Sequence, residues 1–410
     1  MTTLGKHRKA VAATAVVLGG VLALGACGSS GGDGGDDAKN ANSEAHGKKS
    51  SEARIKIASK DGSEGASINN GGNVQVSKGK LTAVSLTAVE GGTSVDGTIS
   101  DDGTSWKPDR QLERATQYKI TAKAKDSGGR KAVENSTFTT VSPDNSFIGT
   151  YTGEDGQSVG VGMPVSINFD KSIANKKAVQ SAIKVNSTSG QEVVGHWFGD
   201  NRLDFRPEDY WKPGSKVTLA LKLDGVKGGP NMTGVQNKSV SFNIGRSQVS
   251  TVDAAKHTMT VVRDGKKLKT IPISAGSAKN PTYNGKMVIS EKHKETRMDG
   301  NTVGFGRKGE EGYDIKDVPH AMRLSTSGTF IHGNYWGAPF GSGNTSHGCV
   351  GLKDARGAGD NSTDGAWFYS NSMIGDVVEV KGSPDKTVQP DNGLNGWNMS
   401  WAEWKAGSAV

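Results

Sequence analysis

Short runs in which apolar and polar residues alternate dominate the chain from about residue 54 onwards. The runs at residues 74–76, 81–84 and 118–122 follow a period of two, which is the period of a half-buried β-strand. The turn formers Asp102-Gly103 lie between such runs. This pattern predicts a small all-β domain over residues 54–143.

A second domain of the same kind is predicted over residues 144–246, because the apolar pattern repeats at a constant offset. The offset is 99 residues (205 − 106 = 99), and it relates aromatic, proline and alternating positions alike. Such constancy indicates an internal repeat rather than a shared composition. Copies of about 100 residues suit immunoglobulin-like β-sandwiches without a disulfide. The matched pairs are Trp106 with Phe205, Lys107 with Arg206, Pro108 with Pro207, Leu112 with Trp211, Tyr118 with Val217 and Ile120 with Leu219.

A third β-rich domain is predicted over residues 247–382. Residues 257–263 and 267–274 alternate on either side of Asp264-Gly265, which predicts a hairpin with a tight turn. Residues 286–292 and 376–380 predict two further strands, and residues 367–369 a short helix that starts at Ser362 or Thr363. The expected fold class is therefore mainly β, with two immunoglobulin-like sandwiches, a third β-rich domain and a few short helices.

The C-terminal segment, residues 383–410, carries helix signals instead. Ser400 and Glu403 have the spacing of a capping box, and Met399 and Trp404 occupy the two hydrophobic-staple positions around it. Tryptophan is concentrated at this end of the chain. The segment is therefore predicted to form a short helix that docks on the body as a Trp-rich cap.

The N-terminal segment has the composition of an export signal. Three basic residues among the first nine precede an apolar stretch at residues 10–26, which is short for a membrane span. The sequence Leu24-Gly25-Ala26-Cys27 resembles the bacterial lipobox, in which the cysteine is lipidated. A cleaved signal with an incidental cysteine is the alternative. Residues 28–53 are nearly free of apolar side chains and predict a flexible tether, so we expect a lipid-anchored protein on the extracytoplasmic face of the membrane.

Composition and charge narrow the possible partners. The chain has 410 residues, 58 of them glycine, and a net charge of +8. This excess favours anionic surroundings, such as lipid or a phosphate-rich cell wall, or describes a solvated surface without a specific partner. Nucleic acid is not expected, because no block of five or more Lys and Arg residues occurs. The two cysteines, Cys27 and Cys349, do not make a disulfide framework.

The candidate chemistry is centred on Ser346-His347-Gly348-Cys349. A cysteine is a useful nucleophile as thiolate, so it needs a base or a positive partner. His332 lies 17 positions earlier (349 − 332 = 17), at the predicted end of a strand over residues 328–332. A backbone carbonyl, such as that of Gly333, would orient its ring. Amide groups near Gly348 could form an oxyanion hole, with each donor contributing about 3 kcal/mol.

Two other interpretations of these residues stay open on spacing alone. A free cysteine is often inert packing in a core. A zinc site built from His320, His332, His347 and Cys349 is also conceivable, although it lacks the paired spacing of strong zinc motifs.

The motif as a whole resembles a known family. Ile331-His332-Gly333 followed by Ser346-His347-Gly348-Cys349 is similar to the signature of the L,D-transpeptidases, whose catalytic domain is YkuD-like. The layout resembles the mycobacterial-type members, with a lipoprotein-like N-terminus, two immunoglobulin-like domains, the catalytic domain over residues 247–382 and a Trp-rich cap.

The resemblance implies a role for each matched residue. Cys349 would be the acyl-accepting nucleophile and His332 its base, and the backbone of His347, Gly348 and Cys349 would line the oxyanion hole. Around them, the residues expected to contact substrate or its loops are Tyr313 as a lid, Ser327, Gly328, Trp336 and Ser346. Gly351 departs from the family, which usually has Asn or Arg there, so donor specificity is the property in question. The loop between His332 and Ser346 is also short for the family.

The resemblance further implies the reaction. Cys349 would attack a peptidoglycan stem tetrapeptide, release D-alanine and hold a thioester until a neighbouring stem's amine forms a 3→3 cross-link. No metal or other cofactor is expected, and β-lactams, particularly carbapenems, would acylate Cys349. The alternatives are an L,D-carboxypeptidase, an enzyme that attaches other amines to the wall, and a non-catalytic wall-binding lipoprotein.

Overall fold

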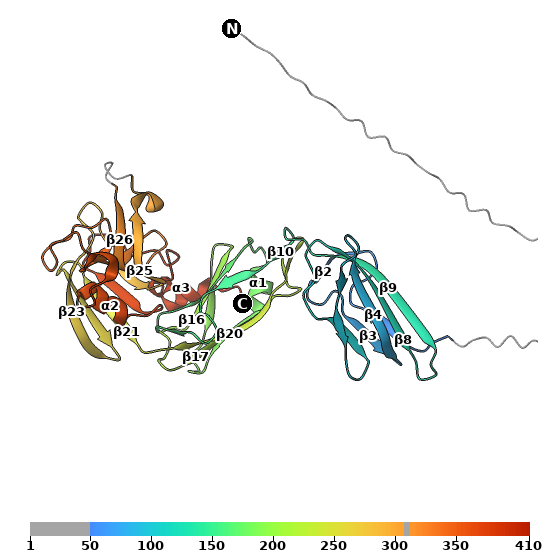
Figure 1. The fold of residues 1–410 in the computed structure, drawn as a ribbon. Helices are drawn as coiled ribbons and strands as arrows, with labels where there is room; N and C mark the ends of the chain where they lie inside the picture. The colour runs from blue at the N-terminus through green and yellow to red at the C-terminus, as the bar shows by residue number, and fades with distance from the viewer. Residues whose placement is uncertain (1–49, 307–311) are drawn as a thin grey trace, which may run out of the picture. The chain divides into compact units, whose positions relative to one another are not determined.

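The computed structural model describes residues 50–306 and 312–410, and the chain is mainly β throughout these ranges (Figure 1). The predicted signal segment, Cys27 and most of the tether lie outside the described residues. Within the described ranges, no helix combines the length and the apolar character needed to cross a membrane.

The first sandwich packs a four-stranded sheet, β1-β3-β7-β6, with a five-stranded sheet, β2-β9-β8-β4-β5. Its core includes Trp106 and Tyr118, which are buried as the alternating pattern predicts. The strands are β1 (Arg54–Ile57), β2 (Ser63–Ala66), β3 (Val74–Ser77), β4 (Lys80–Ala88), β5 (Ser94–Val95), β6 (Gly97–Ile99), β7 (Ser105–Pro108), β8 (Gln117–Lys125) and β9 (Lys131–Thr140).

The second sandwich has two four-stranded sheets, β11-β13-β16-β15 and β12-β20-β17-β14, and a small sheet, β10-β19-β18. Four of the six residue pairs at the offset of 99 fall in corresponding strands, two in β7 and β16 and two in β8 and β17. Pro207 directly follows β16, and Leu112 and Trp211 lie in connecting segments. Its elements are β10 (Ser146–Phe147), β11 (Gly149–Tyr151), β12 (Ser158–Val159), β13 (Val165–Phe169), α1 (Lys176–Ser181), β14 (Ile183–Ser187), β15 (Val194–Phe198), β16 (Arg202–Arg206), β17 (Lys216–Lys222), β18 (Lys227–Gly229), β19 (Met232–Gly234) and β20 (Asn237–Ile244).

The third region forms a nine-stranded sheet with the order β24-β29-β21-β22-β23-β28-β27-β26-β25. The predicted hairpin is present, with Asp264 and Gly265 both at positive φ in the turn between β22 and β23. The elements are β21 (Gln248–Asp253), β22 (Thr258–Arg263), β23 (Lys266–Ser274), β24 (Gly285–Val288), β25 (Glu291–Asp299), η1 (Gly300–Val303), β26 (Asp314–Arg323), β27 (Phe330–Asn334), β28 (Val350–Lys353), η2 (Arg356–Ala358), α2 (Asp364–Asn371) and β29 (Val377–Lys381).

Two predicted strand boundaries are wrong. The single strand expected at residues 286–292 is two strands, because β24 pairs with β29 and β25 pairs with β26 at the other end of the sheet order. Ile289 and Ser290 make the crossing and donate their amides to Asp376 O and Arg323 O, both at 3.0 Å. The strand expected to end at His332 continues through Asn334, because Gly333 and Asn334 pair with Leu352 and Lys353.

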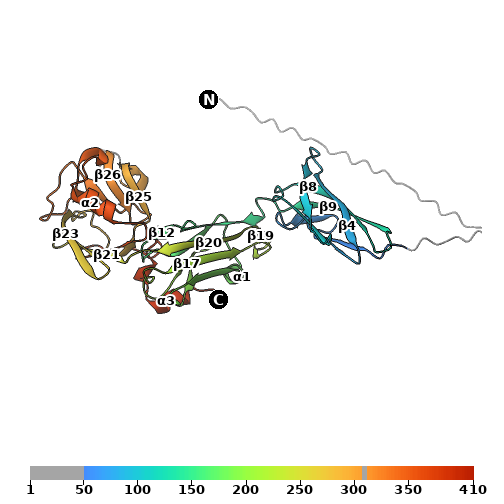
Figure 2. The same ribbon diagram turned by 60° about the horizontal axis from the view of Figure 1, so that its bottom comes forward.

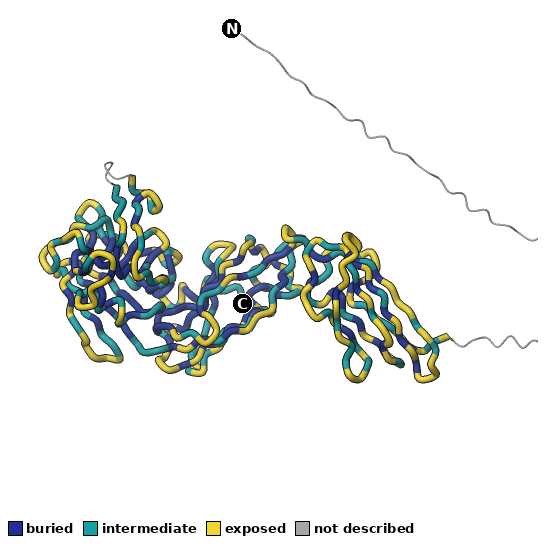
Figure 3. The backbone as a smooth tube through the Cα atoms, in the orientation of Figure 1, coloured by how far each residue is buried: buried dark blue, intermediate teal, exposed yellow. Residues whose placement is uncertain are grey.

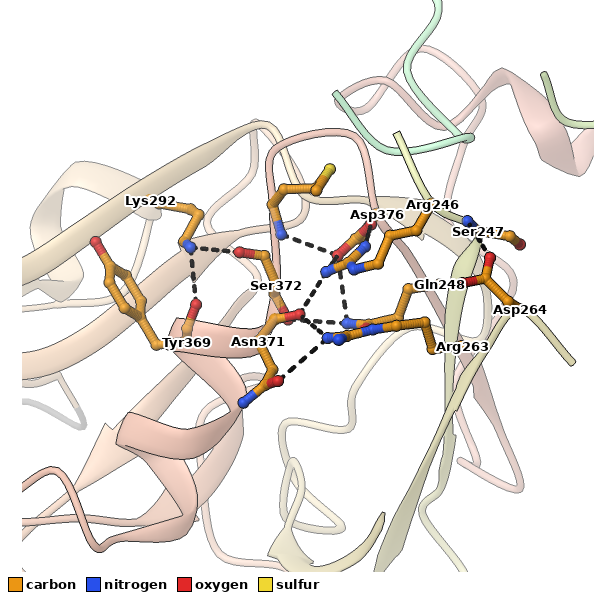
Figure 4. Close-up of polar contacts among 11 residues, drawn as sticks. Arg246, Ser247, Gln248, Arg263, Asp264, Lys292, Tyr369, Asn371, Ser372 and Asp376 are labelled. Atoms are coloured by element: carbon orange, nitrogen blue, oxygen red, sulfur yellow. Dashed lines mark hydrogen bonds and ion pairs between the residues drawn. The ribbon is translucent and has the colours of Figure 1, made fainter. Parts of the chain in front are cut away.

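Helix α2 is held at both ends by side chains. Its N-cap is Thr363, as predicted, and the Thr363 hydroxyl accepts from the Ala366 amide at 3.2 Å. At the C-terminal end, Lys292, Arg246 and Arg263 donate to carbonyl oxygens of residues 369–372 (Figure 4). Such cations complement the negative end of a helix dipole. The buried carboxylate of Asp376 bonds Arg246 at 2.8 Å in the same cluster.

The C-terminal segment forms η3 (Gly396–Asn398) and α3 (Trp401–Ala406), and both halves of the predicted capping box are present. Helix α3 lies beside the second sandwich (Figure 2). Trp404 is fully buried against strand β15, where its indole Nε1 donates to Val194 O at 2.9 Å. Arg206 is buried beneath Trp397, Trp401 and Trp404, with its guanidinium carbon 4.3 Å from the Trp404 ring. In each sandwich and in the third region, the buried residues lie mainly along the strands and the exposed residues mainly at the loops (Figure 3).

Candidate functional site

The ladder between β27 and β28 places the candidate nucleophile beside the candidate base. These strands run parallel, with His332 opposite Gly351. Cys349 directly precedes β28, so two stretches that are 17 positions apart meet at one edge of a cavity of about 180 Å³. The cavity is lined by the predicted residues Tyr313, His332, Trp336, Ser346, His347, Cys349 and Gly351.

The other predicted residues lie close by but not in this cavity. Ser327, Gly328 and Gly348 line a neighbouring cavity of about 290 Å³, to which His347 also contributes. Gly333 lies behind His332 in β27 and contacts neither space. The sequence missed five residues of the first cavity that come from other strands and loops: Ser274, Met298, Ile315, Asn334 and Thr345.

His332 is fixed in one orientation by its own strand. The side chain is only 5% exposed, and Nδ1 lies 2.8 Å from the carbonyl oxygen of Gly333. A carbonyl oxygen can only accept, so Nδ1 carries the proton and Nε2 is left with its lone pair. Burial lowers the pKa of the imidazole, against the raising effects of the Gly333 hydrogen bond and the Asp354 charge. The prediction that a backbone carbonyl orients this ring is confirmed.

Cys349 is a protonated thiol at neutral pH. It is 7% exposed, and burial raises the pKa of the thiol from 9.0 to about 11, while a backbone hydrogen bond from Phe330 lowers it. Its Sγ lies 3.6 Å from the carbonyl oxygen of Gly328, to which the thiol donates. Since a thiol is a weak nucleophile, a base must take its proton when it reacts. The neutral imidazole of His332 is suited to do so.

The turn before Cys349 is held by a serine hydroxyl. Gly348 has φ of +111°, which only glycine adopts readily. Its amide donates to Ser346 Oγ at 3.1 Å, and that hydroxyl donates to Cys349 O at 2.6 Å. The Gly348 amide therefore has to exchange partners before it can bind an oxyanion. The role of the amides at positions 347–349 stays a prediction.

Three rings separate the two cavities. Tyr313 lies 5.2 Å and Phe305 lies 5.4 Å from the His347 ring centroid, and the two are 5.9 Å apart. Burial, and then the nearby Cys349, raise the pKa of the Tyr313 hydroxyl to about 12. Tyr313 is thus neutral and forms an apolar wall beside the thiol. Trp336 stacks on His332 on another side, at 5.6 Å and 23°.

Gly351 has room for a side chain. A Cβ there would lie 3.5 Å from Ser274 O and 3.6 Å from Asn334 Cβ, which are ordinary contact distances. The backbone therefore does not require glycine at this position. The absent side chain instead leaves space on the wall of the cavity beside Asn334.

The sequence also missed a buried carboxylate behind the site. His320, considered above as a zinc ligand, bonds Asp354 instead, with Nδ1 2.8 Å from Oδ2. Within residues 50–306 and 312–410, no group of three or more His, Cys, Asp or Glu side chains is arranged to hold a metal ion. No local pattern marked this pair, because its members are 34 positions apart.

The sequence resemblance implied a β-rich catalytic domain with Cys349 and His332 at one site. The structure has a mainly β region in which these two residues line the same cavity. The family model for the "L,D-transpeptidase catalytic domain" matches residues 247–380. The family model for the "Bacterial Ig domain" matches residues 63–227.

Named relatives agree with these matches. The chain is 34% identical to L,D-transpeptidase 2 of Mycobacterium tuberculosis over 351 residues, covering 85% of this chain and 83% of that protein. It is 31% identical to L,D-transpeptidase 5 of the same species, covering 82% and 73%. The chain belongs to the L,D-transpeptidase family. A solved structure of an LD transpeptidase in complex with imipenem is 27% identical, with a TM-score of 0.48, and covers 57% of this chain and 97% of that one.

Proposed function

We propose that this protein is a peptidoglycan L,D-transpeptidase that forms 3→3 cross-links through a thioester on Cys349. The observation that supports this most directly is the shared cavity of Cys349 and His332, in which the His332 Nδ1 proton is held by Gly333 O and Nε2 is free to act as a base. Membership of the family supports the same reaction.

The first half-reaction acylates the cysteine. Sγ of Cys349 adds to the carbonyl carbon before the terminal D-residue of a donor stem, and the thiol proton passes to Nε2 of His332. The tetrahedral intermediate then collapses, the C–N bond breaks, and His332 returns the proton to the leaving amine of D-alanine. Burial keeps both groups neutral at rest, so charge appears only as the bond forms.

The second half-reaction transfers the acyl group. The amine of an acceptor stem attacks the thioester, and His332 takes a proton from the attacking nitrogen. The C–S bond then breaks, and His332 returns the proton to the sulfur to restore the thiol. The missing side chain at Gly351 leaves space in the cavity wall beside the acyl group. A β-lactam would acylate the same sulfur by ring opening, which expels no leaving group.

Intact-protein mass spectrometry with imipenem tests the nucleophile. We expect the full chain to gain the mass of one imipenem and the Cys349→Ala variant to gain none while keeping its melting temperature. An adduct of equal yield in Cys349→Ala would refute the assignment. Incubation of a donor stem with and without an acceptor stem then separates transpeptidation from hydrolysis, since only transpeptidation yields a cross-linked dimer.

We also propose that the protein is anchored by lipid at Cys27 on the extracytoplasmic face of the membrane. The lipobox-like Leu24-Gly25-Ala26-Cys27 supports this. In cells, replacement of Cys27 by Ala should move the protein from the membrane fraction to a soluble one. Unchanged membrane association of that variant, without incorporated fatty acid in the parent protein, would contradict the anchor.

A further inference from the structure

A buried histidine–carboxylate pair lies directly behind the candidate base. The His320 side chain is 4% exposed and that of Asp354 is 0% exposed, and the two are joined at 2.8 Å. His320 comes from β26 at a positive φ of +50°, a backbone conformation that is uncommon outside glycine. Its ring packs on Tyr369 of α2 at 5.0 Å. A strained, buried histidine–carboxylate pair is costly to keep, so it calls for a role.

Asp354 is held as an anion acceptor by three donors. Besides His320, the hydroxyl of Thr363 and the amide of Ala355 both donate to Oδ1 at 2.8 Å. Thr363 is also the N-cap of α2, so the carboxylate lies at the positive end of that helix. These contacts satisfy the carboxylate fully within the fold.

The carboxylate fits between two glycines, and one of them belongs to the site. A Cβ on Gly333 or on Gly365 would lie 2.1 Å from Asp354 Oδ2, so neither position could carry a side chain without moving it. Gly333 is the residue whose carbonyl oxygen accepts from His332 Nδ1. Asp354 is therefore packed against the peptide that orients the base, and its charge also acts on the His332 ring.

From these contacts we propose that Asp354, held by His320, is a positioning residue for His332: it fixes the Gly333 carbonyl and supplies a buried negative charge that favours the imidazolium formed during acylation. The inference rests on the proposed function. It differs from a Ser–His–Asp arrangement because the carboxylate does not bond the imidazole and acts through the intervening peptide and through space.

Other charged groups near the pair and the base have partners or are exposed. On the cavity side His332 faces Cys349, Tyr313 and His347. Around Asp354, Asp364 of α2 is paired with Lys269 at 2.7 Å, and Arg356 is paired with Asp317 at 2.6 Å. Tyr369 packs on His320, and Lys353 of β28 is exposed. Asp354 is thus the buried carboxylate that packs directly against Gly333.

The test is the pH profile of acylation by imipenem, followed by stopped-flow absorbance on the full chain. Two variants remove the charge: Asp354→Asn, which is isosteric, and the double variant His320→Gln/Asp354→Asn, which replaces the pair by two amides. The matched control is Asp317→Asn, which removes an equal charge from β26 at an exposed position.

We expect the acidic limb of the profile to move down by about half to one pH unit in both charge-removing variants, because the imidazolium loses its nearby anion and the pKa of His332 falls. The plateau rate should fall roughly three- to tenfold, since a weaker base takes the thiol proton less readily. Asp317→Asn should keep the parent profile.

Each outcome decides the proposal. A purely structural role would lower the plateau and leave the limb at the parent pH, and that result in either folded variant overturns the inference. Loss of the fold in both variants also overturns it, because the pair would then serve folding rather than the base. A parent protein that forms no imipenem adduct would instead refute the proposed function, which keeps the two failures distinct.

Discussion

The resting protonation state of Cys349 predicts how the free protein reacts with iodoacetamide as pH is varied. Its thiol pKa is raised from 9.0 to about 11 by burial, and a shift of two units leaves about a hundredfold less thiolate below pH 9. At pH 7 roughly one thiol in ten thousand is ionised. The alkylation rate should therefore rise about tenfold for each pH unit between pH 7 and pH 10.

Peptide mass mapping measures the alkylation of Cys349 separately from that of any other thiol. The chain unfolded in urea is the reference, and its rate should level off about two pH units earlier than that of the folded chain. Limited access of iodoacetamide to the cavity would lower the alkylation rate by the same factor at every pH. The pH at which the rate levels off, and not the rate itself, therefore reports the pKa of the thiol.

A plateau below pH 8 would refute the reasoning, because it would mean a resting thiolate paired with an imidazolium. The His332→Ala variant sharpens the comparison. If His332 and Cys349 are both neutral at rest, the pH profile of Cys349 alkylation in His332→Ala should keep the parent's midpoint. If His332 is instead an imidazolium that stabilises a thiolate, its loss would raise that midpoint by more than one pH unit.

Three further predictions concern stability and specificity. Trp404→Ala should lower the free energy of unfolding by about 3–5 kcal/mol, since it empties a fully buried site. Thermal denaturation measures this loss of stability. A loss no larger than that caused by Trp401→Ala, at a half-buried position, would contradict the prediction. Asp376→Asn should destabilise the protein by about 3 kcal/mol, because it breaks the buried pair with Arg246. Burial raises the pKa of this carboxyl. An unchanged urea unfolding curve would contradict a stabilising role of the pair. Gly351→Asn should change stability by less than about 1 kcal/mol, because its Cβ meets only ordinary contacts; if the ratio of cross-linked to hydrolysed product also stays constant, the open space there does not select the acceptor.

The sequence predicted those features that local patterns determine. Alternation predicted strands β3, β4 and β8 of the first sandwich and β22, β23 and β29 of the third region. Asp264-Gly265 predicted the hairpin, and Ser400 with Glu403 predicted the capping box. The motif at residues 346–349 and His332 were found because their spacing is short and their chemistry is distinctive. The Gly333 carbonyl could be named because it follows directly after the base.

Features that depend on tertiary packing were missed. The strand expected at residues 286–292 is broken because its two halves pair with opposite ends of the sheet order, which no alternation pattern records. Lys107 and Arg206 occupy equivalent repeat positions, yet Lys107 is exposed and Arg206 is buried. The difference comes from tryptophans about 190 residues further on (397 − 206 = 191), which cover Arg206.

The C-terminal segment has a consequence for the order of folding. The backbone of Gly407 accepts from the Trp197 amide at 3.0 Å, and Gln180 bonds both Ser408 and Ala409. His196 bonds Trp404 O at 2.9 Å. Because a chain is synthesised from its N-terminus, this side of the second sandwich stays uncovered until the last residues have been made. The second sandwich can therefore be completed only after the entire third region has been synthesised.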